Sequence, residues 1–211
     1  MDSGELAWAA SVVVLAGGFG ALGAPWLVAL AGAQRWWLTR PVVAIAMVAV
    51  AIVCLTGLGW RGAVLPVLLA MVAATAAALV DAASQRLPDA IVLRAYIPVL
   101  TAVGAAAALE RSPWVLAAAV AGMSTLWLFY LVLTLINPTG MGWGDVKLAG
   151  LLGAVLGLMG LRAALLGAGL GFVLAASYAV LVLAVRRRRR TETFPLGPFM
   201  VIGAAAGIIT S

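Results

Sequence analysis

The sequence has 211 residues, of which 65% are hydrophobic and only 9% are charged, and its mean hydropathy is +1.18. A soluble domain of this length needs far more polar surface, so the composition excludes one and predicts an integral membrane protein. Ala, Leu, Val and Gly dominate without strand-type alternation, which predicts transmembrane helices rather than barrel strands. We therefore expect an all-α, polytopic helix bundle that forms a single membrane domain over residues 1–211.

The net charge of +6 does not indicate nucleic-acid binding, because the basic residues lie in short loops between apolar runs. The chain has no histidine and one cysteine, Cys54, inside an apolar run. These counts exclude an intrachain disulfide, a cysteine zinc site and a His-based catalytic triad. Residues 1–5 carry two acids and no base, unlike a signal peptide, so the first apolar run is expected to be a retained span.

Apolar runs that approach the roughly 20 residues of a membrane span follow one another along the chain. We expect eight spans, at about 6–30, 42–58, 64–80, 91–109, 114–136, 146–159, 161–185 and 197–209. The sixth and eighth are short, and either could be tilted, extended at its ends or re-entrant. The glycine spacing in 153–160 and 167–171 predicts close helix packing.

The loops between these spans alternate in charge. One set carries 10 basic residues and the other carries 3. The positive-inside rule places the first set in the cytoplasm and both termini outside, and it places Asp81 and Asp145 at the cytoplasmic face. The first set is Arg35, Arg40, Arg86, Arg94, Lys147 and the arginines at 186–190, and the second set is Arg61, Arg111 and Arg162.

Two of the 7 acidic residues stand out against this apolar background. Asp145 lies in Met141-Gly142-Trp143-Gly144-Asp145-Val146-Lys147, just before an expected helix, and Asp81 ends another long apolar run. Ionisable groups at or within a bilayer are rare and are functional-site candidates. Two carboxylates held close together share a proton and titrate as a pair, which suits acid–base hydrolysis. Glycines beside Asp145 would let backbone and substrate approach closely.

Each of these residues also has a purely structural interpretation. Asp145 could be the N-cap of the following helix, and Asp81 could reach water or pair with Arg86. Lys147 could be an interfacial lysine whose side chain extends towards the cytoplasm. A third acid, Asp89, lies nearby, and we expect it to belong to a turn. Spacing alone does not show that Asp81 and Asp145 meet.

Three segments together resemble the type IV prepilin peptidases, which are bacterial membrane aspartic proteases. GMGWGDVKLAGLLGAVLG resembles the Gly-x-Gly-Asp segment of that family, DAASQRLPDAIVL its other catalytic stretch, and TFPLGPFMVIGA its proline- and glycine-bearing stretch. They occur in the family's order across residues 81–206, a peptidase-like core, whereas residues 1–63 would form N-terminal spans of uncertain role. The resemblance implies that Asp81 and Asp145 are the catalytic pair, with Gly142 and Gly144 in the glycine positions.

The resemblance also assigns supporting positions. Lys147 matches the lysine that follows the Gly-x-Gly-Asp motif, and Leu87-Pro88-Asp89 stands where the family has Ile-Pro-Asn. Many members also carry paired cysteines that bind zinc and are linked to N-methylation. This chain has one cysteine, so the resemblance implies a peptidase that needs neither metal nor organic cofactor, and N-methyltransferase activity is in doubt. The remaining supporting residues are Pro88, Pro195, Gly197 and Pro198.

The expected function is an aspartic endopeptidase of the bacterial inner membrane. It would cleave basic leader peptides from prepilin or pseudopilin substrates at the cytoplasmic face, with the apolar substrate helix docked against the bundle. The expected partners are that substrate and membrane lipid, not nucleic acid, and the oligomeric state is left open. The alternatives are a proton- or cation-coupled transporter with the aspartates as a relay, and a non-catalytic assembly subunit. Two acids at one face and the lack of matching halves favour the peptidase over a transporter.

Overall fold

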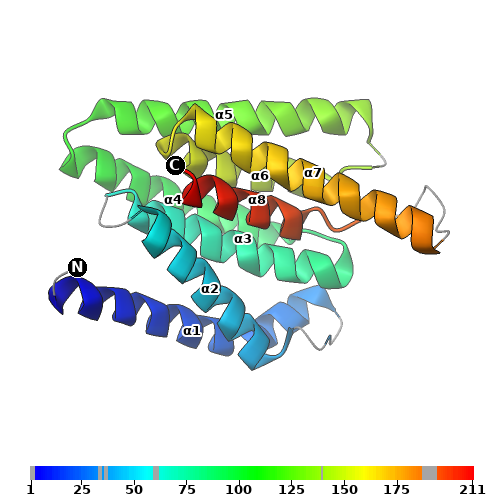
Figure 1. Cartoon of the computed structure of the whole chain (residues 1–211), viewed down its shortest axis with the longest axis horizontal. Coiled ribbons are helices and arrows are strands. Elements are labelled where there is room, and N and C mark those ends of the chain that lie inside the picture. Colours follow the sequence, from blue (N-terminus) through cyan, green and yellow to red (C-terminus); the bar gives the residue numbers. More distant parts are fainter. Residues whose placement is uncertain (1–2, 33–34, 36–37, 59–61, 139, 187–193) are drawn as a thin grey trace.

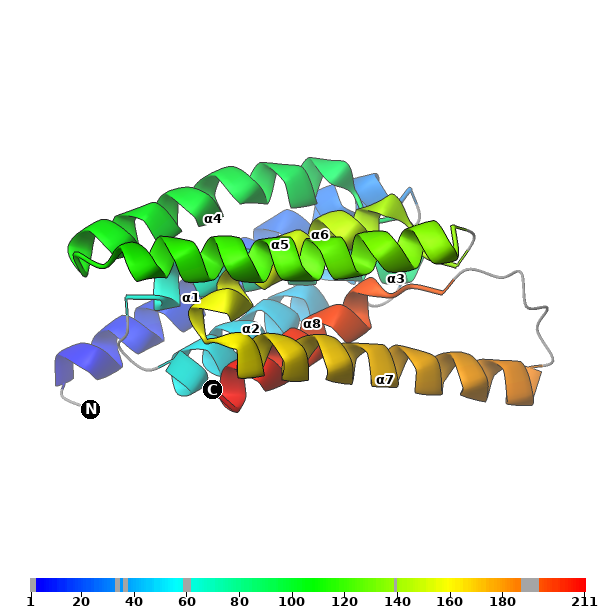
Figure 2. The ribbon, with the colours of Figure 1, turned by 90° about the horizontal axis from the view of Figure 1, so that it is seen from above.

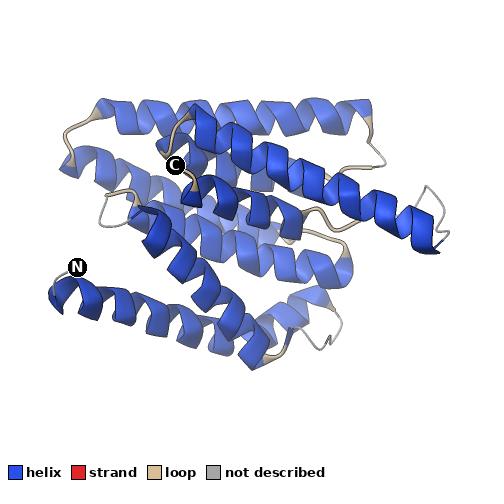
Figure 3. Cartoon of the chain, in the orientation of Figure 1, coloured by secondary structure: helices blue, strands red, loops and turns tan. Residues whose placement is uncertain are grey.

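The computed structural model describes the whole chain except residues 1–2, 33–34, 36–37, 59–61, 139 and 187–193. Within the part that it describes, every regular element is a helix (Figure 3). The all-α expectation is therefore confirmed. The helices are α1 (Ser3–Ala31), α2 (Arg40–Leu58), α3 (Val64–Ser84), α4 (Asp89–Leu109), α5 (Pro113–Ile136), α6 (Trp143–Leu158), α7 (Leu161–Arg186) and α8 (Gly197–Ile209).

Six of these helices, α1 to α5 and α7, are long and apolar enough to cross a membrane. Helices α6 and α8 have 16 and 13 residues. At a rise of 1.5 Å per residue they extend roughly 24 and 20 Å, less than the ~30 Å hydrocarbon core of a bilayer. The protein is thus an integral membrane protein with six candidate spans. The two shorter helices, α6 and α8, correspond to the sixth and eighth expected spans, which the sequence already indicated to be short.

Most helices run roughly along one long direction, whereas α2 crosses it obliquely, and α1 and α2 lie at one side of the bundle (Figure 1). A view turned by 90° places α4 and α7 on opposite sides, with α3, α6 and α8 between them (Figure 2). Helix α6 is the most enclosed of these, because its side chains from Asp145 to Gly157 are all buried except that of Lys147. It packs against α3, α4, α5, α7 and α8. A short, fully surrounded helix can present a polar residue at its end without exposing it to lipid.

Glycines allow α6 to approach α5 closely. A Cβ atom on Gly153 or Gly157 would overlap backbone atoms of α5, including the carbonyl oxygen of Gly122. The same relation holds between α7 and α8, where a Cβ on Gly203 would overlap the backbone of Gly167. The expected small-residue packing is confirmed at these positions. Gly160 differs, because its surroundings are open and its φ of +97° places it in the turn between α6 and α7.

The charge asymmetry that orients the chain involves residues at both ends of the bundle. Arg86 and Lys147 lie at the end where α3 stops and α6 starts, whereas Arg111 and Arg162 lie at the end where α4 stops and α7 starts. Arg61 and the arginines at 187–190 lie outside the described residues. The orientation of the bundle across the membrane therefore remains a prediction.

Candidate active site

The two aspartates come together at one end of the bundle. Asp81 lies in the last turn of α3, and Asp145 lies in the first turn of α6. Their relative exposures are 4% and 8%, so both carboxylates are buried. Helix α3 packs against both α6 and α8, which brings the start of α8 to the same place. The spacing of Asp81 and Asp145 in the sequence does not show whether they lie close together, and the packing of the helices places them at the same end of the bundle.

Asp81 is held by the start of α8. The backbone N–H of Gly197, the first residue of α8, donates a 2.9 Å hydrogen bond to Oδ2 of Asp81. The first N–H groups of a helix lack partners within it and carry its positive dipole end, so they stabilise a carboxylate. This contact offsets the unfavourable dipole at the C-terminal end of α3. In the described part of the chain Arg86 forms no ion pair with Asp81, so the alternative pairing is not observed.

Asp145 is held in a similar way by its own helix. Helix α6 begins at Trp143 rather than near residue 146, and Gly142 is its N-cap. Asp145 is therefore the third residue of the helix, not the N-cap residue, and its Oδ2 accepts a 3.0 Å hydrogen bond from the N–H of Gly142. A side chain that reaches back to the N-cap N–H in this way forms half of a capping box.

The protonation of Asp145, which lies outside the six candidate spans, is tuned by its surroundings. Burial raises the pKa of Asp145, the Gly142 hydrogen bond lowers it, and the charge of Asp81 raises it, with burial dominant. The electrostatic interaction between the two carboxylates means that they do not titrate independently. One of them can hold a proton while the other is ionised.

The hydrogen bonds of the two carboxylates involve one oxygen of each. Among the described residues, the hydrogen bonds to Asp81 and Asp145 use Oδ2 in each case, and none reaches Oδ1. Both side chains line one cavity of about 430 Å³. The other lining residues are Gln85, Arg86, Leu87, Asp89, Pro138, Gly140, Met141, Gly142, Trp143, Gly144, Lys147 and Phe194.

The two motif glycines have different structural requirements. A Cβ atom on Gly144 would lie 2.6 Å from the Cβ of Leu87, so α6 can approach the loop after α3 only with glycine there. A Cβ on Gly142 would meet its nearest neighbour, Oδ2 of Asp145, at 3.6 Å, which is an ordinary contact. Gly142 has a φ of −86°, so its backbone does not require glycine either. At Gly142 the backbone N–H, rather than the missing side chain, contributes to the site.

The supporting residues fall into separate places. Lys147 lines the cavity, and its Nζ lies 2.7 Å from Oδ1 of Asp89, so its side chain is ion-paired. Pro88 is the N-cap residue of α4. Pro195 and Pro198 line a different groove, formed mainly by α3 and α8. In the proline- and glycine-bearing segment, Gly197 hydrogen-bonds Asp81, and Phe194 lines the cavity.

Sequence reasoning missed two tyrosines near the site. Tyr96 on α4 donates a 2.7 Å hydrogen bond to the carbonyl oxygen of Lys147. Tyr130 on α5 is fully buried and interacts electrostatically with Asp145. Each lies within a continuous apolar run, where the sequence does not distinguish an aromatic residue of a functional site from one that only packs in the core. The one available signal was the seven-residue spacing from Asp89 to Tyr96, which places both on one face of a helix.

Within the described residues, no group of three or more His, Cys, Asp or Glu side chains is placed to hold a metal ion. Asp81 and Asp145 both line the cavity of about 430 Å³, so two carboxyl groups, candidates for proton transfer, face one space.

Comparison with known protein families matches this chain to the type IV leader peptidase family over residues 67–185. Three curated relatives are named prepilin leader peptidase/N-methyltransferase. The chain is 36% identical over 135 residues to the protein of Pseudomonas putida, a match that covers 64% of this chain and 46% of the relative. It is 31% identical over 142 residues to that of Stutzerimonas stutzeri, with 64% and 45% covered.

The third relative, from Pseudomonas aeruginosa, is 36% identical over 135 residues, with 60% of this chain and 43% of the relative covered. The chain thus spans less than half the length of the curated relatives it matches. No solved structure matches the chain. The family match covers more than half of the sequence and includes both aspartates and the whole of α6, and the chain belongs to the type IV leader peptidase family.

Proposed function

We propose that the protein is a membrane aspartic endopeptidase that removes the leader peptide from prepilin-type substrates. One observation carries the proposal: Asp81 and Asp145 are buried, each is held by one backbone N–H at the start of a short helix, and both open onto one cavity. The printed names of the three relatives support a prepilin substrate.

The proposed reaction uses the two carboxylates as an acid and a base. The ionised member takes a proton from a water molecule, whose oxygen bonds to the carbon of the scissile peptide. The protonated member donates its proton to the carbonyl oxygen. Collapse of the tetrahedral intermediate breaks the C–N bond, and the first carboxyl returns its proton to the leaving amine. As the C=O bond re-forms, the second carboxylate takes back the proton of one hydroxyl, so the pair again holds one proton. The raised pKa of Asp145 suits it to hold the proton at the start of the cycle.

The position of the cavity fits a substrate that is part helix and part extended chain. It lies where α3 ends and α6 begins, so an apolar substrate helix docked along the bundle would bring its leader junction to the aspartates. Arg86, Arg94 and Lys147 lie at this end, and by the positive-inside rule they support a reaction at the cytoplasmic face. In bacteria this corresponds to the inner membrane. Family membership favours the peptidase over the transporter alternative.

The direct test uses the purified protein in lipid nanodiscs and a synthetic peptide with a basic leader followed by an apolar segment. Mass spectrometry should find two products from one cut at the leader junction. Asp81→Asn is the matched control and should leave the peptide intact. An uncut peptide with the unmodified protein, or equal cutting by the control, would contradict the proposal.

The proposal covers peptide cleavage and not methyl transfer. The same reaction run with an isotopically labelled methyl donor should leave the new N-terminus of the product unlabelled. Label in that product would show that the chain also transfers methyl groups.

A further inference from the structure

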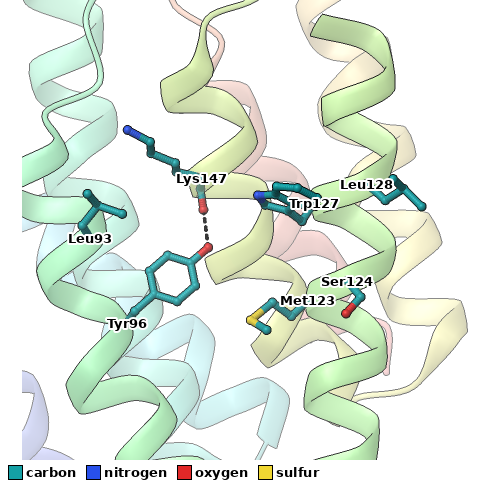
Figure 4. A pocket seen from close by; sticks show the side chains of 7 residues that line it. All are labelled: Leu93, Tyr96, Met123, Ser124, Trp127, Leu128 and Lys147. Carbon is teal, nitrogen blue, oxygen red and sulfur yellow. Dashed lines mark hydrogen bonds between the residues drawn. The ribbon is translucent and has the colours of Figure 1, made fainter. Parts of the chain in front are cut away.

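Helix α4 holds Lys147 at two of its atoms. Oδ1 of Asp89 lies 2.7 Å from Nζ of Lys147. The Tyr96 hydroxyl donates a 2.7 Å hydrogen bond to the Lys147 carbonyl oxygen (Figure 4). Asp89 and Tyr96 are seven residues apart, about two helical turns, so they project from the same face of α4. Lys147 follows Asp145 by two residues, in the first turns of α6. Both contacts therefore act on the segment that carries the aspartate.

The fit around Tyr96 shows that this contact is built into the helix packing. A Cβ atom on Gly150 would overlap the Tyr96 hydroxyl, so glycine at this position makes room for the phenol against α6. Trp127 of α5 closes the other side, with its Cδ1 3.3 Å from the same Cβ position. Figure 4 shows the phenol of Tyr96 pointing from α4 towards the Lys147 carbonyl. The Lys147 carbonyl oxygen lies inside α6, where a backbone N–H one turn later is its usual donor, so the hydrogen bond from Tyr96 is an additional connection.

The start of α6 needs an external anchor more than most helix starts do. Helix α6 is short, it follows an irregular segment, and its N-terminal residues include Gly142 and Gly144, which restrict the backbone least. The Gly142 hydrogen bond fixes Asp145 relative to its own helix but not relative to α3 and Asp81. A misplacement of about 1 Å in a catalytic group can cost roughly a hundredfold in rate. The α4 contacts add directional polar links to the apolar packing that holds α6 in the bundle.

We infer that Asp89 and Tyr96 form a clamp on Lys147 that fixes the first turn of α6 and so orients the Asp145 carboxylate. Both are positioning residues for the peptidase reaction, and this role rests on the proposed function. Asp89 then does more than form a turn, and Lys147 is an anchored residue rather than a free interfacial lysine. The half-exposed ion pair contributes less than the tyrosine contact, because water screens it.

The test compares Tyr96→Phe with Tyr178→Phe, each of which removes one phenolic hydroxyl. Tyr178 lies on α7, its ring packs against Phe199, and its hydroxyl makes no hydrogen bond with the described residues. Two readouts are taken on the intact protein in nanodiscs. The rate of hydrogen exchange at the amides of residues 147–151 measures how firmly the start of α6 is held. The kcat and KM for the leader peptide measure the effect on catalysis.

We expect Tyr96→Phe to speed exchange at residues 147–151 several-fold and to lower kcat about fivefold with KM unchanged, as loss of one neutral hydrogen bond implies. Tyr178→Phe should match the unmodified protein in both readouts. Asp89→Asn provides a second variant that should lower kcat about twofold in the same direction. Asp89→Glu, which keeps the charge, should restore most of that loss.

The two possible failures are distinguishable. If the unmodified protein cuts the peptide but Tyr96→Phe retains its exchange rates and its kcat, the clamp is overturned and the proposed function stands. Faster exchange in Tyr96→Phe with an unchanged kcat would likewise overturn the positioning role. If the unmodified protein does not cut the peptide, the proposed function fails, whatever the exchange rates show.

Discussion

The N–H of Gly197 donates a 2.9 Å hydrogen bond to Oδ2 of Asp81, although the two residues are 116 positions apart in the sequence. The contact joins the C-terminal end of α3 to the N-terminal end of α8. It gives the proline- and glycine-bearing segment a specific place in the site. It also explains how a carboxylate is accommodated at the C-terminal end of an apolar helix.

Gly197→Ala should therefore impair the site. The new Cβ would lie 3.0 Å from Oδ2 of Asp81 and 3.3 Å from the Cα of Ala78, so either the carboxylate or the start of α8 must shift. A weakened hydrogen bond to an ionised group implies a loss of about tenfold in kcat. Gly169→Ala on α7 is the control, because its surroundings are open. Equal leader cleavage by the two variants would show that the Gly197 contact is unimportant.

The two motif glycines should respond differently to alanine. In Gly144→Ala the new Cβ meets Leu87 at 2.6 Å through two rigid Cβ atoms, so we expect the free energy of unfolding to fall by about 1–3 kcal/mol. Gly142→Ala places its Cβ in ordinary contacts and should leave that free energy nearly unchanged. Thermal unfolding in detergent measures both. A Gly142→Ala variant that is less stable than Gly144→Ala would contradict this prediction.

Much of the fold could be predicted from the sequence, because an apolar run of about 20 residues in a membrane satisfies its backbone hydrogen bonds by forming a helix. The start of α6 was misplaced by three residues, since Trp143 and Gly144 do not extend the apolar pattern of the helix. The Asp89–Lys147 pair could not be predicted, because nothing in the sequence links two charged residues near the starts of separate helices, α4 and α6. Asp81 and Asp145 could be identified as site residues because acidic residues are rare in this chain and because their segments resemble a known family. That the two side chains lie close together depends on helix packing, which their spacing in the sequence does not encode.

The stability contribution of Asp145 should depend on pH. Burial raises its pKa, so the folded state holds the proton more tightly than the unfolded state does. The resulting stabilisation is fully present below the unfolded-state pKa and is lost as pH rises through the folded-state pKa. Asp145→Asn cannot ionise, so its melting temperature relative to the unmodified protein should increase between about pH 4 and pH 7, the range between the ordinary pKa of this carboxyl and its raised pKa. A pH-independent difference would mean that burial does not perturb this carboxyl group.

Chelators should not reduce leader cleavage. The chain has no histidine and one cysteine, Cys54, which is buried in the bundle. The proposed reaction moves protons between carboxyl groups and water and has no step for a metal. Cleavage rates before and after strong chelation, with the same peptide, should agree. A loss of activity that an added metal ion restores would exclude this mechanism.

The most direct test of the central claim compares leader cleavage by Asp81→Asn, Asp145→Asn and the double variant. Asparagine keeps the shape and can still accept the Gly142 or Gly197 hydrogen bond, but it cannot exchange the proton. Each single variant should lose activity by roughly a thousandfold or more, and the double variant should be no worse, because residues that act as one unit give non-additive losses. Asp89→Asn should lose only about twofold, since its ion pair is half-exposed. Near-normal cleavage by either single variant would contradict the aspartic mechanism.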